Sequence, residues 1–333
     1  MANYAELQVT TNFTFLRGAS HPEEIVAEAD ALGLTAVAVT DRNSLAGVVR
    51  AHGTAKKVGI RLIVGARLDL TDAPSLLCFP TERAAYGRLS RLLTIGKRRA
   101  PKGACHIALA DVLEHVDGQI IIALPPDNNA INVDPAFAAH LHNLASCLEH
   151  KQLYLAAHHL YRGDDEKRIA AFARLAETTG VPLVATNDVH AHSPARRRLQ
   201  DVLACIREHC TIDTAGYRLL ANVERHLKPG DEMARLFCRH PDAIRRTVEI
   251  ARACCFSLDE LAYEYPDDEA PAGTTPQAEL ARLTWEGATR RYPDGIPENV
   301  HTQLTHEIKL IGELAYAPYF LTVHDIVRFA RSR

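Results

Sequence analysis

The stretch that decides the fold is VPLVATNDVH at residues 181–190. Its first half is a short apolar run of the kind that forms a buried strand, and its end places Asp188 and His190 two positions apart. Residues i and i+2 of a strand point to the same face, so these two side chains can converge on one cation. A divalent metal needs about four to six donors. The pair therefore needs partners from other parts of the chain.

Short apolar runs and helical patterns alternate through the first 200 residues. This alternation predicts an α/β fold built on a parallel sheet or barrel. Apart from the run at 181–185, the expected strands lie at residues 7–10, 35–40, 60–65, 76–79, 119–123 and 153–157. The expected helices between them lie at residues 21–32, 44–58, 83–95, 135–150 and 166–180.

After about residue 205 the pattern changes to helices with little strand. A turn-rich segment at 266–273 separates two groups of helices. The last helix runs to the end of the chain without a stop signal, so we expect the chain to end within a domain. We expect three parts, an α/β barrel at 1–205, a helical extension and linker at 206–270, and a helical part at 271–333. The expected helices lie at residues 231–237, 241–254, 276–292, 297–316 and 318–331.

Composition excludes several classes of protein. The hydrophobic fraction of 47% and the charged fraction of 24% are ordinary for a soluble globular chain, and no apolar run approaches the roughly 18 residues that cross a bilayer. The first residues lack a secretory signal, so we expect a cytoplasmic protein with no membrane partner. Its eight cysteines include no C-x-x-C pair, so we interpret them as reduced and buried rather than as zinc ligands.

The net charge of −3 gives no overall attraction to nucleic acid. One local basic cluster could touch DNA phosphates, although a solvated loop is the simpler interpretation. It consists of Lys97, Arg98, Arg99 and Lys102.

Sites in α/β barrels lie at the carboxyl ends of the strands, and the polar residues found there carry a family resemblance. The segments LQVTTNF (7–13), AVTDR (38–42), IVGAR (63–67) and ATNDVH (185–190) resemble successive motifs of the polymerase and histidinol phosphatase (PHP) domain. Segments 217–228 and 315–326 are more narrowly similar to the bacterial DNA polymerase III alpha-type family, closest to its error-prone, damage-inducible branch. Segments 256–261 and 284–288 also fit that branch.

The resemblance implies a distorted barrel of seven strands, followed from residue 271 by the helical start of a polymerase core. Metal-bearing members of the family carry His-x-His in the first motif, Asp-His in the second and Glu in the third. These side chains hold a cluster of Zn²⁺, Mn²⁺ or similar ions that hydrolyses phosphoesters.

This chain departs from that pattern at most of those positions. Gln8 and Thr10 replace the two imidazoles, and Arg17 stands where an acid often follows. Arg42 and Arg67 replace a histidine and a glutamate. Amides and hydroxyls are weak ligands, and arginines remain protonated at any working pH. A positive unit charge about 4 Å from an arginine is repelled by roughly 4 kcal/mol at an effective dielectric near 20. A divalent metal ion at the same distance is repelled twice as strongly.

The surviving acids can then take a different role. We expect Asp188 and Asp41 to pair with Arg42 or Arg67, so that internal ion pairs replace the metal cluster. The resulting degenerate site comprises Gln8, Thr10, Arg17, Asp41, Arg42, Arg67, Asp188 and His190.

The competing interpretation is a reduced site that still holds residual Zn²⁺ or Mn²⁺. Its ligands would be Asp41, His158, Asp188 and His190, with His159 or His106 nearby. It would make the chain a metal-dependent phosphoesterase or a 3′–5′ proofreading exonuclease. The first interpretation makes it a scaffold module of an error-prone polymerase that synthesises DNA across lesions.

The scaffold interpretation requires no cofactor in this part of the protein. The resemblance places the polymerase carboxylates and their Mg²⁺ ions beyond residue 333, and the densest acidic run, at 267–269, has the composition of a solvated turn. The expected partners are the remaining polymerase domains in cis and DNA. Through the whole protein they include the sliding clamp and damage-response accessory proteins.

Overall fold

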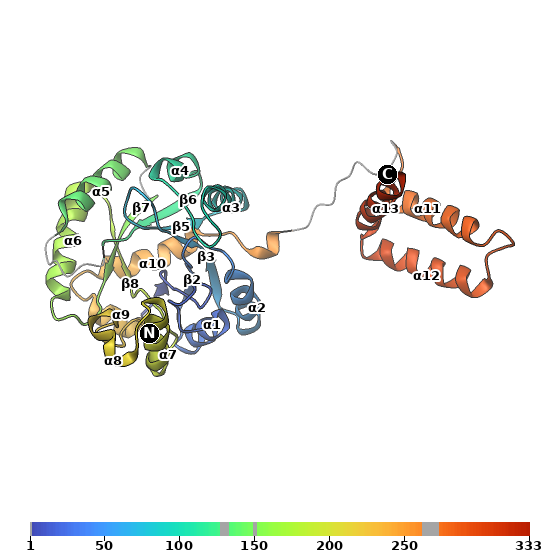
Figure 1. Ribbon diagram of the computed structural model, residues 1–333. Helices are drawn as coiled ribbons and strands as arrows, with labels where there is room; N and C mark the ends of the chain where they lie inside the picture. The colour runs from blue at the N-terminus through green and yellow to red at the C-terminus, as the bar shows by residue number, and fades with distance from the viewer. Residues whose placement is uncertain (1, 127–132, 149–151, 262–272) are drawn as a thin grey trace. The chain divides into compact units, whose positions relative to one another are not determined.

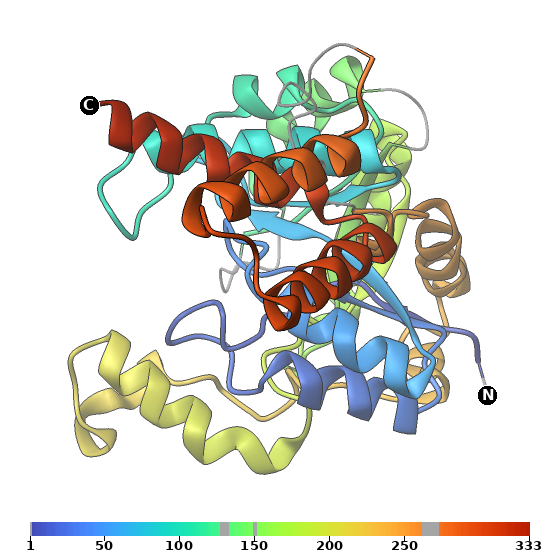
Figure 2. The same ribbon diagram turned by 90° about the vertical axis from the view of Figure 1, so that its right-hand side faces the viewer.

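The computed structural model describes residues 2–126, 133–148, 152–261 and 273–333, and its contacts divide the chain into two units (Figures 1 and 2). The first unit is Met1–Leu261 and the second is Ala262–Arg333. Residues 206–261 therefore pack with the expected barrel, and the boundaries expected after residues 205 and 270 stay predictions. The acidic run 267–269 and most of the expected linker lie outside the described residues.

The strands described in the first unit form two sheets. The three-stranded sheet contains β1 (Ala5–Glu6), β2 (Ala36–Val39) and β3 (Arg61–Val64). The five-stranded sheet contains β4 (Ala66–Leu68), β5 (Leu76–Pro80), β6 (Gln119–Ala123), β7 (Leu153–His158) and β8 (Leu183–Thr186). Only Gly65 separates β3 from β4, so counting them as one run gives the seven strands that the resemblance implies.

Two isolated bridges connect the two sheets. Val9 pairs with Val189, and Arg42 pairs with Arg67. The first bridge joins the chain after β1 to the chain after β8, which brings the first and last strands of the barrel together. The α/β fold and the distorted barrel are thus confirmed, with the strands divided between two sheets rather than joined in one closed ladder.

The expectation of a parallel sheet is wrong for one strand. β5 runs antiparallel to both β4 and β6, and the other pairings are parallel. β4 and β5 are joined by residues 69–75, which contain no helix. So short a connection suits an antiparallel pair, because a parallel pair needs a crossover of a dozen or more residues.

Helices surround the outside of the strands (Figure 1). Those between the strands are α1 (Pro22–Ala31), α2 (Val48–Val58), α3 (Arg83–Arg98), α4 (Leu109–Glu114), α5 (Pro135–Cys147) and α6 (Asp165–Thr179). Those after β8 include α7 (Arg197–Arg207), α8 (Ile212–Ala215), α9 (Gly230–Leu236) and α10 (Pro241–Ala253). As expected, Gly59 ends α2, in the left-handed conformation at φ +86° that glycine adopts without strain.

The expected helices do not include α4, α7 or α8. α4 has six residues and α8 has four, which is too short for a periodic signal. In α7 the apolar side chains Leu199, Val202 and Ile206 recur at helical spacing, so the sequence did carry a signal for this helix, although these side chains are exposed and Ala204 is buried.

Alternate residues of the strands belong to different parts of the core. Val37 and Val39 of β2 pack with the outer helices, whereas Ala36 and Ala38 belong to a second buried cluster that includes Ile250 of α10. α10 contacts β8 of the five-stranded sheet and β1 of the three-stranded sheet. It therefore covers the side of these strands that faces away from the outer helices. With both faces covered, the free carboxyl ends of the strands are where a site can form.

The second unit is the smaller all-helical region that the sequence predicts. It contains α11 (Pro276–Arg291), α12 (Glu298–Glu313) and α13 (Ala317–Ser332). Its small core is formed by Leu280, Ala317 and Leu321. Across the part of the chain that is described, none of the helices has the length and apolar character needed to cross a membrane.

Candidate functional site

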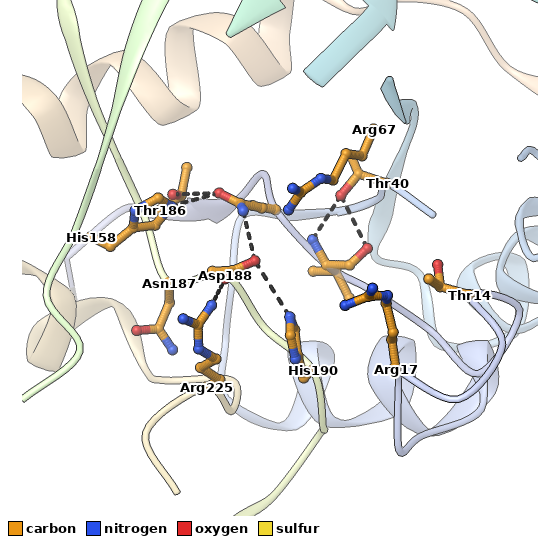
Figure 3. Close-up of polar contacts among 12 residues, drawn as sticks. Thr14, Arg17, Thr40, Arg67, His158, Thr186, Asn187, Asp188, His190 and Arg225 are labelled. Carbon is orange, nitrogen blue, oxygen red and sulfur yellow. Dashed lines mark hydrogen bonds and ion pairs between the residues drawn. The ribbon is translucent and has the colours of Figure 1, made fainter. Parts of the chain in front are cut away.

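Asp188 is the centre of a buried polar network just beyond β8 (Figure 3). Its backbone is left-handed at φ +45°, a conformation that aspartate tolerates better than most residues. Oδ1 accepts a hydrogen bond from Nε2 of Gln8 at 2.6 Å, and Oδ2 contacts the guanidinium of Arg225. Nε2 of His190 lies 3.6 Å from Oδ1. Both carboxylate oxygens therefore already have protein partners.

Gln8 connects Asp188 to the neighbouring strands. Its Oε1 accepts from Oγ1 of Thr186 at 3.0 Å and lies 2.8 Å from Nε2 of His158. A carboxylate only accepts, so the amide nitrogen of Gln8 must face Asp188 and Oε1 must face His158. The nearby Nε2 of His158 therefore carries a proton and cannot offer its lone pair to a metal.

Arg42 and Arg67 share one acid, Asp69. Nη1 of Arg42 and Nε of Arg67 each lie 2.7 Å from an oxygen of Asp69, and Ser75 donates to the same carboxylate at 2.7 Å. The two arginines together hold the pKa of Asp69 below its usual value, although burial alone would raise it. The expected pairing of these arginines with Asp188 or Asp41 is wrong. Asp69 lies two residues after Arg67 on the same side of the chain, so it reaches both guanidinium groups first.

Asp41 faces a cage of threonine donors instead of the network around Asp188. Thr11 donates to it from its backbone N at 2.8 Å and from Oγ1 at 2.7 Å, and Thr14 donates from Oγ1 at 2.7 Å. The side chain is fully buried, and burial raises its pKa. Asp41 therefore has a structural role in holding the loop after β1.

The other two predicted residues lie on the segment after β1. Thr10 is buried, and its backbone N donates to the carbonyl of Val189 at 2.8 Å, which continues the pairing of the first and last strands. Arg17 is half-buried, and burial, then the neighbouring Arg42 and Arg207, lower its pKa to about 10. Among the described residues, no carboxylate lies within ion-pair distance of its guanidinium.

One cavity of about 530 Å³ collects most of the predicted residues. Those lining it are Gln8, Arg17, Arg42, Arg67, His158, Asp188 and His190, whereas Thr10 and Asp41 do not. The sequence reasoning missed Asp69 and the arginines that the helical segments add. Arg225 had a signal, because it lies in the polymerase-like segment 217–228, but that segment gave no reason to place it beside Asp188.

These residues do not fit the metal cluster that the family implies. Within the described ranges, no three His, Cys, Asp or Glu side chains come together as metal ligands would. The alternative ligand set is dispersed, because Asp41 faces Thr11 and Thr14. His159 packs edge-on against Tyr161 with ring centres 5.0 Å apart, and His106 is exposed and does not line the cavity.

The basic cluster at residues 97–102 lies outside this cavity. Lys97 and Arg98 form the last turn of α3, and Arg99 pairs with Asp111 at 2.7 Å. Lys97, Arg98, Arg99 and Lys102 are exposed, and their contact with DNA stays a prediction.

Comparison with known proteins gives two family matches. The PHP domain matches residues 6–180, and the family described as bacterial DNA polymerase III alpha NTPase domain matches residues 278–333. The error-prone DNA polymerase of Caulobacter vibrioides is 53% identical over 330 residues, which cover 99% of this chain and 30% of that protein. The error-prone DNA polymerase of Rhodopseudomonas palustris is 50% identical over 335 residues, with the same coverage. The chain thus spans about 30% of the length of these relatives.

A solved structure of an amidohydrolase from Chromobacterium violaceum is also similar in fold. Its TM-score is 0.41 at 16% identity, and the match covers 56% of this chain and 88% of that chain.

Proposed function

Because this chain belongs to the PHP domain family and is homologous to the N-terminal part of error-prone DNA polymerases, we propose that it is a non-catalytic module of such a polymerase. The observation that supports a non-catalytic role most directly is the engagement of Asp188. Its carboxylate is bonded to Gln8 on one side and to Arg225 on the other, so the family's metal ligand has become part of an internal ion pair. The ion pair stabilises the barrel, and the barrel supports the domains that follow it.

The surrounding charge supports the same proposal. Metal-assisted phosphoester hydrolysis needs ions that generate hydroxide and stabilise the leaving oxygen. Here Arg42 and Arg67 occupy two former ligand positions, and each would repel a divalent ion by several kcal/mol at about 4 Å. Replacing Gln8 alone would leave this repulsion in place.

The activity of the whole protein belongs to the proposal as well. We place Mg²⁺-dependent synthesis across lesions in the remaining polymerase domains, which contact this module in cis. DNA, the sliding clamp and damage-response accessory proteins would bind through the whole protein in the cytoplasm. The relatives named above are error-prone DNA polymerases, and their length leaves room for those domains.

The test is metal content together with nuclease activity. The purified chain is incubated with Zn²⁺ or Mn²⁺, passed through a desalting column and subjected to elemental analysis, with a metal-bearing PHP enzyme treated in parallel. We expect well below one metal per chain and no trimming of single-stranded DNA. Stoichiometric metal together with trimming that Asp188→Ala abolishes would overturn the proposal in favour of a proofreading exonuclease or phosphoesterase.

A further inference from the structure

The turn at the end of α7 brings two cysteines together. The last residue of the helix is Arg207, and His209, two residues later, is left-handed at φ +51°. The backbone N of Cys210 donates to the carbonyl of Cys205 at 3.0 Å. The backbone N of His209 donates to the carbonyl of Ile206 at 3.4 Å. These features define a Schellman motif, in which side chains at the positions of Cys205 and Cys210 commonly contact each other.

The backbone bond places the two cysteines within the span of a disulfide. With an N–O distance of 3.0 Å, the Cα atoms of Cys205 and Cys210 can be at most about 7 Å apart. Disulfides join Cα atoms separated by roughly 4.4–6.8 Å, so the bond can form with little movement of the backbone. Burial, and then a side-chain hydrogen bond with Cys210, raise the pKa of the Cys205 thiol. The two thiols therefore lie beside each other in the reduced chain.

The two thiols differ in their access to solvent. Cys205 is buried, with 6% of its surface exposed, whereas Cys210 is partly exposed. A small oxidant in solution therefore meets Cys210 first, and Cys205 is placed behind it to complete a disulfide. An accessible thiol next to a resolving thiol is the usual arrangement of redox-sensing cysteines.

The remaining cysteines are arranged differently. Cys254 and Cys255 are neighbours in sequence, and their Cα atoms, about 3.8 Å apart, are too close for an unstrained disulfide. The expectation that the cysteines are buried is wrong for three of them, because Cys147, Cys238 and Cys255 are exposed. Exposure alone therefore does not distinguish Cys210, and its contact with Cys205 does.

We propose that Cys205 and Cys210 form a reversible redox site, which a peroxide oxidises to a disulfide. The thiolate of Cys210 attacks hydrogen peroxide, the O–O bond breaks, and a sulfenic acid and hydroxide form. The sulfur of Cys205 then attacks the sulfenic sulfur, which forms the S–S bond and releases water. Overall, two thiols lose two electrons and two protons, and the peroxide becomes two water molecules.

The disulfide would act on the part of the chain that holds the rim of the barrel. From α7, Gln200 donates to the carbonyl of Arg17 at 2.7 Å and Arg207 donates to the carbonyl of Leu16 at 2.8 Å. A bond between Cys205 and Cys210 fixes the turn that follows these contacts. In the cytoplasm, where we place the protein, disulfides are typically transient and redox-sensing. The proposal does not depend on the scaffold function, because neither cysteine lines the cavity at the strand ends.

The experiment is peptide mapping of the 333-residue chain after oxidation. The reduced chain is freed of reductant, treated with hydrogen peroxide, alkylated with N-ethylmaleimide in denaturant and digested with trypsin. Trypsin cleaves after Arg198, Arg207 and Arg218, so the disulfide is detected as peptide 199–207 joined to peptide 208–218. We expect this species to form at least about tenfold faster than any other disulfide, because its thiols are already in contact. Dithiothreitol should restore both thiols.

Two variants provide the comparison. Cys210→Ser should abolish the linked peptides, because it removes the accessible thiol. Cys238→Ser should leave their rate of formation unchanged. Cys238 is the matched control, because it is an exposed cysteine in the turn after α9.

Each outcome decides the proposal. It is overturned if the linked peptides do not form, if another pair of cysteines is joined as fast, or if Cys210 is oxidised to sulfinic acid while Cys205 stays a free thiol. Linked peptides that resist dithiothreitol, or that Cys238→Ser slows as much as Cys210→Ser does, would overturn it as well. The map of the unsubstituted chain identifies the joined residues by itself, so the result stands even if a variant fails to fold.

Discussion

The guanidinium of Arg225 contacts Oδ2 of Asp188, so a cation supplied by the protein itself occupies one side of this carboxylate. Both side chains are almost completely buried. The ion pair joins the end of β8 to the segment before α9, and the backbone N–H of His190 reinforces the connection by donating to the carbonyl of Arg225 at 2.9 Å. The Asp188–Arg225 pair is therefore a packing contact between the barrel and its helical extension.

Asp188→Asn should lower the free energy of unfolding by about 1–3 kcal/mol, because Arg225 loses its buried counter-charge. Urea denaturation measures the change. The matched control is Asp242→Asn, which removes an acid from the exposed pair with Arg245 and should cost less than about 0.5 kcal/mol. Equal losses in the two variants would show that the buried pair is no more stabilising than a surface pair.

Gln8→Leu should destabilise the chain more than Gln200→Leu. Both glutamines are buried, but Gln8 makes contacts to Asp188, His158 and Thr186, whereas Gln200 donates to the carbonyl of Arg17. We expect a loss of about 2–4 kcal/mol for Gln8→Leu and about 1 kcal/mol for Gln200→Leu, because each buried partner left unpaired is penalised. Chemical denaturation of both variants provides the comparison, and a larger loss for Gln200→Leu would contradict it.

Glu6 should make stability depend on pH near neutrality. Burial raises the pKa of its carboxyl to about 7, while hydrogen bonds from Tyr4 and from the backbone of Gln8 oppose the rise. The folded chain then holds this proton more tightly than the unfolded chain, whose ordinary value is 4.5. The stabilising contribution is complete below about pH 4.5 and is lost as the pH rises through about 7.

The variant Glu6→Gln tests this sign, because glutamine does not titrate. Between pH 5 and pH 8 its stability relative to the original chain should rise by about 2–3 kcal/mol, since one pKa unit corresponds to about 1.4 kcal/mol. Denaturation curves at a series of pH values give the difference. Parallel curves for the two proteins would rule out a raised pKa at Glu6.

Gly47→Ala and Gly53→Ala should have effects of opposite sign. A Cβ at Gly47 would lie 2.6 Å from Oδ2 of Asp41, so it would disturb the cage formed by Thr11 and Thr14 and cost about 1–3 kcal/mol. A Cβ at Gly53, within α2, would meet nothing within 4 Å. Alanine there should stabilise the chain by about 0.5–1 kcal/mol, because it forms helix more readily than glycine. Melting temperatures that fall in both variants would contradict the second expectation.

Most helices and strands could be predicted from the sequence because their buried residues recur in a regular hydrophobic pattern. The run at 119–123 has the bounds of β6, and the helical pattern ending at Gly59 has the end of α2. The direction of β5 could not be predicted in this way. Hydrophobic periodicity marks a buried strand but does not say which neighbour it pairs with or in which sense.

For the site, the sequence predicted where the residues lie but not which residues they interact with. Gln8, Arg42 and Asp188 could be placed near one another because the ends of barrel strands meet at one rim. Their partners could not be assigned, because that choice depends on which way each side chain points. Asp69, which directly follows β4, forms ion pairs with Arg42 and Arg67. Arg225 lies in the helical extension, and the strand pattern does not indicate that this segment contacts Asp188.

The pairing of Val9 with Val189 has a consequence for how the chain folds. The Gln8–Asp188 hydrogen bond spans 180 positions, so it can form only after one of the largest loops in the first unit has closed. Contacts of such long sequence separation form slowly compared with the local pairing of neighbouring strands. During synthesis the cavity can be completed only after the segment carrying Arg225 has left the ribosome. α10, which packs against β1 and β8, emerges later still, so the rim of the barrel can be assembled before its core is complete.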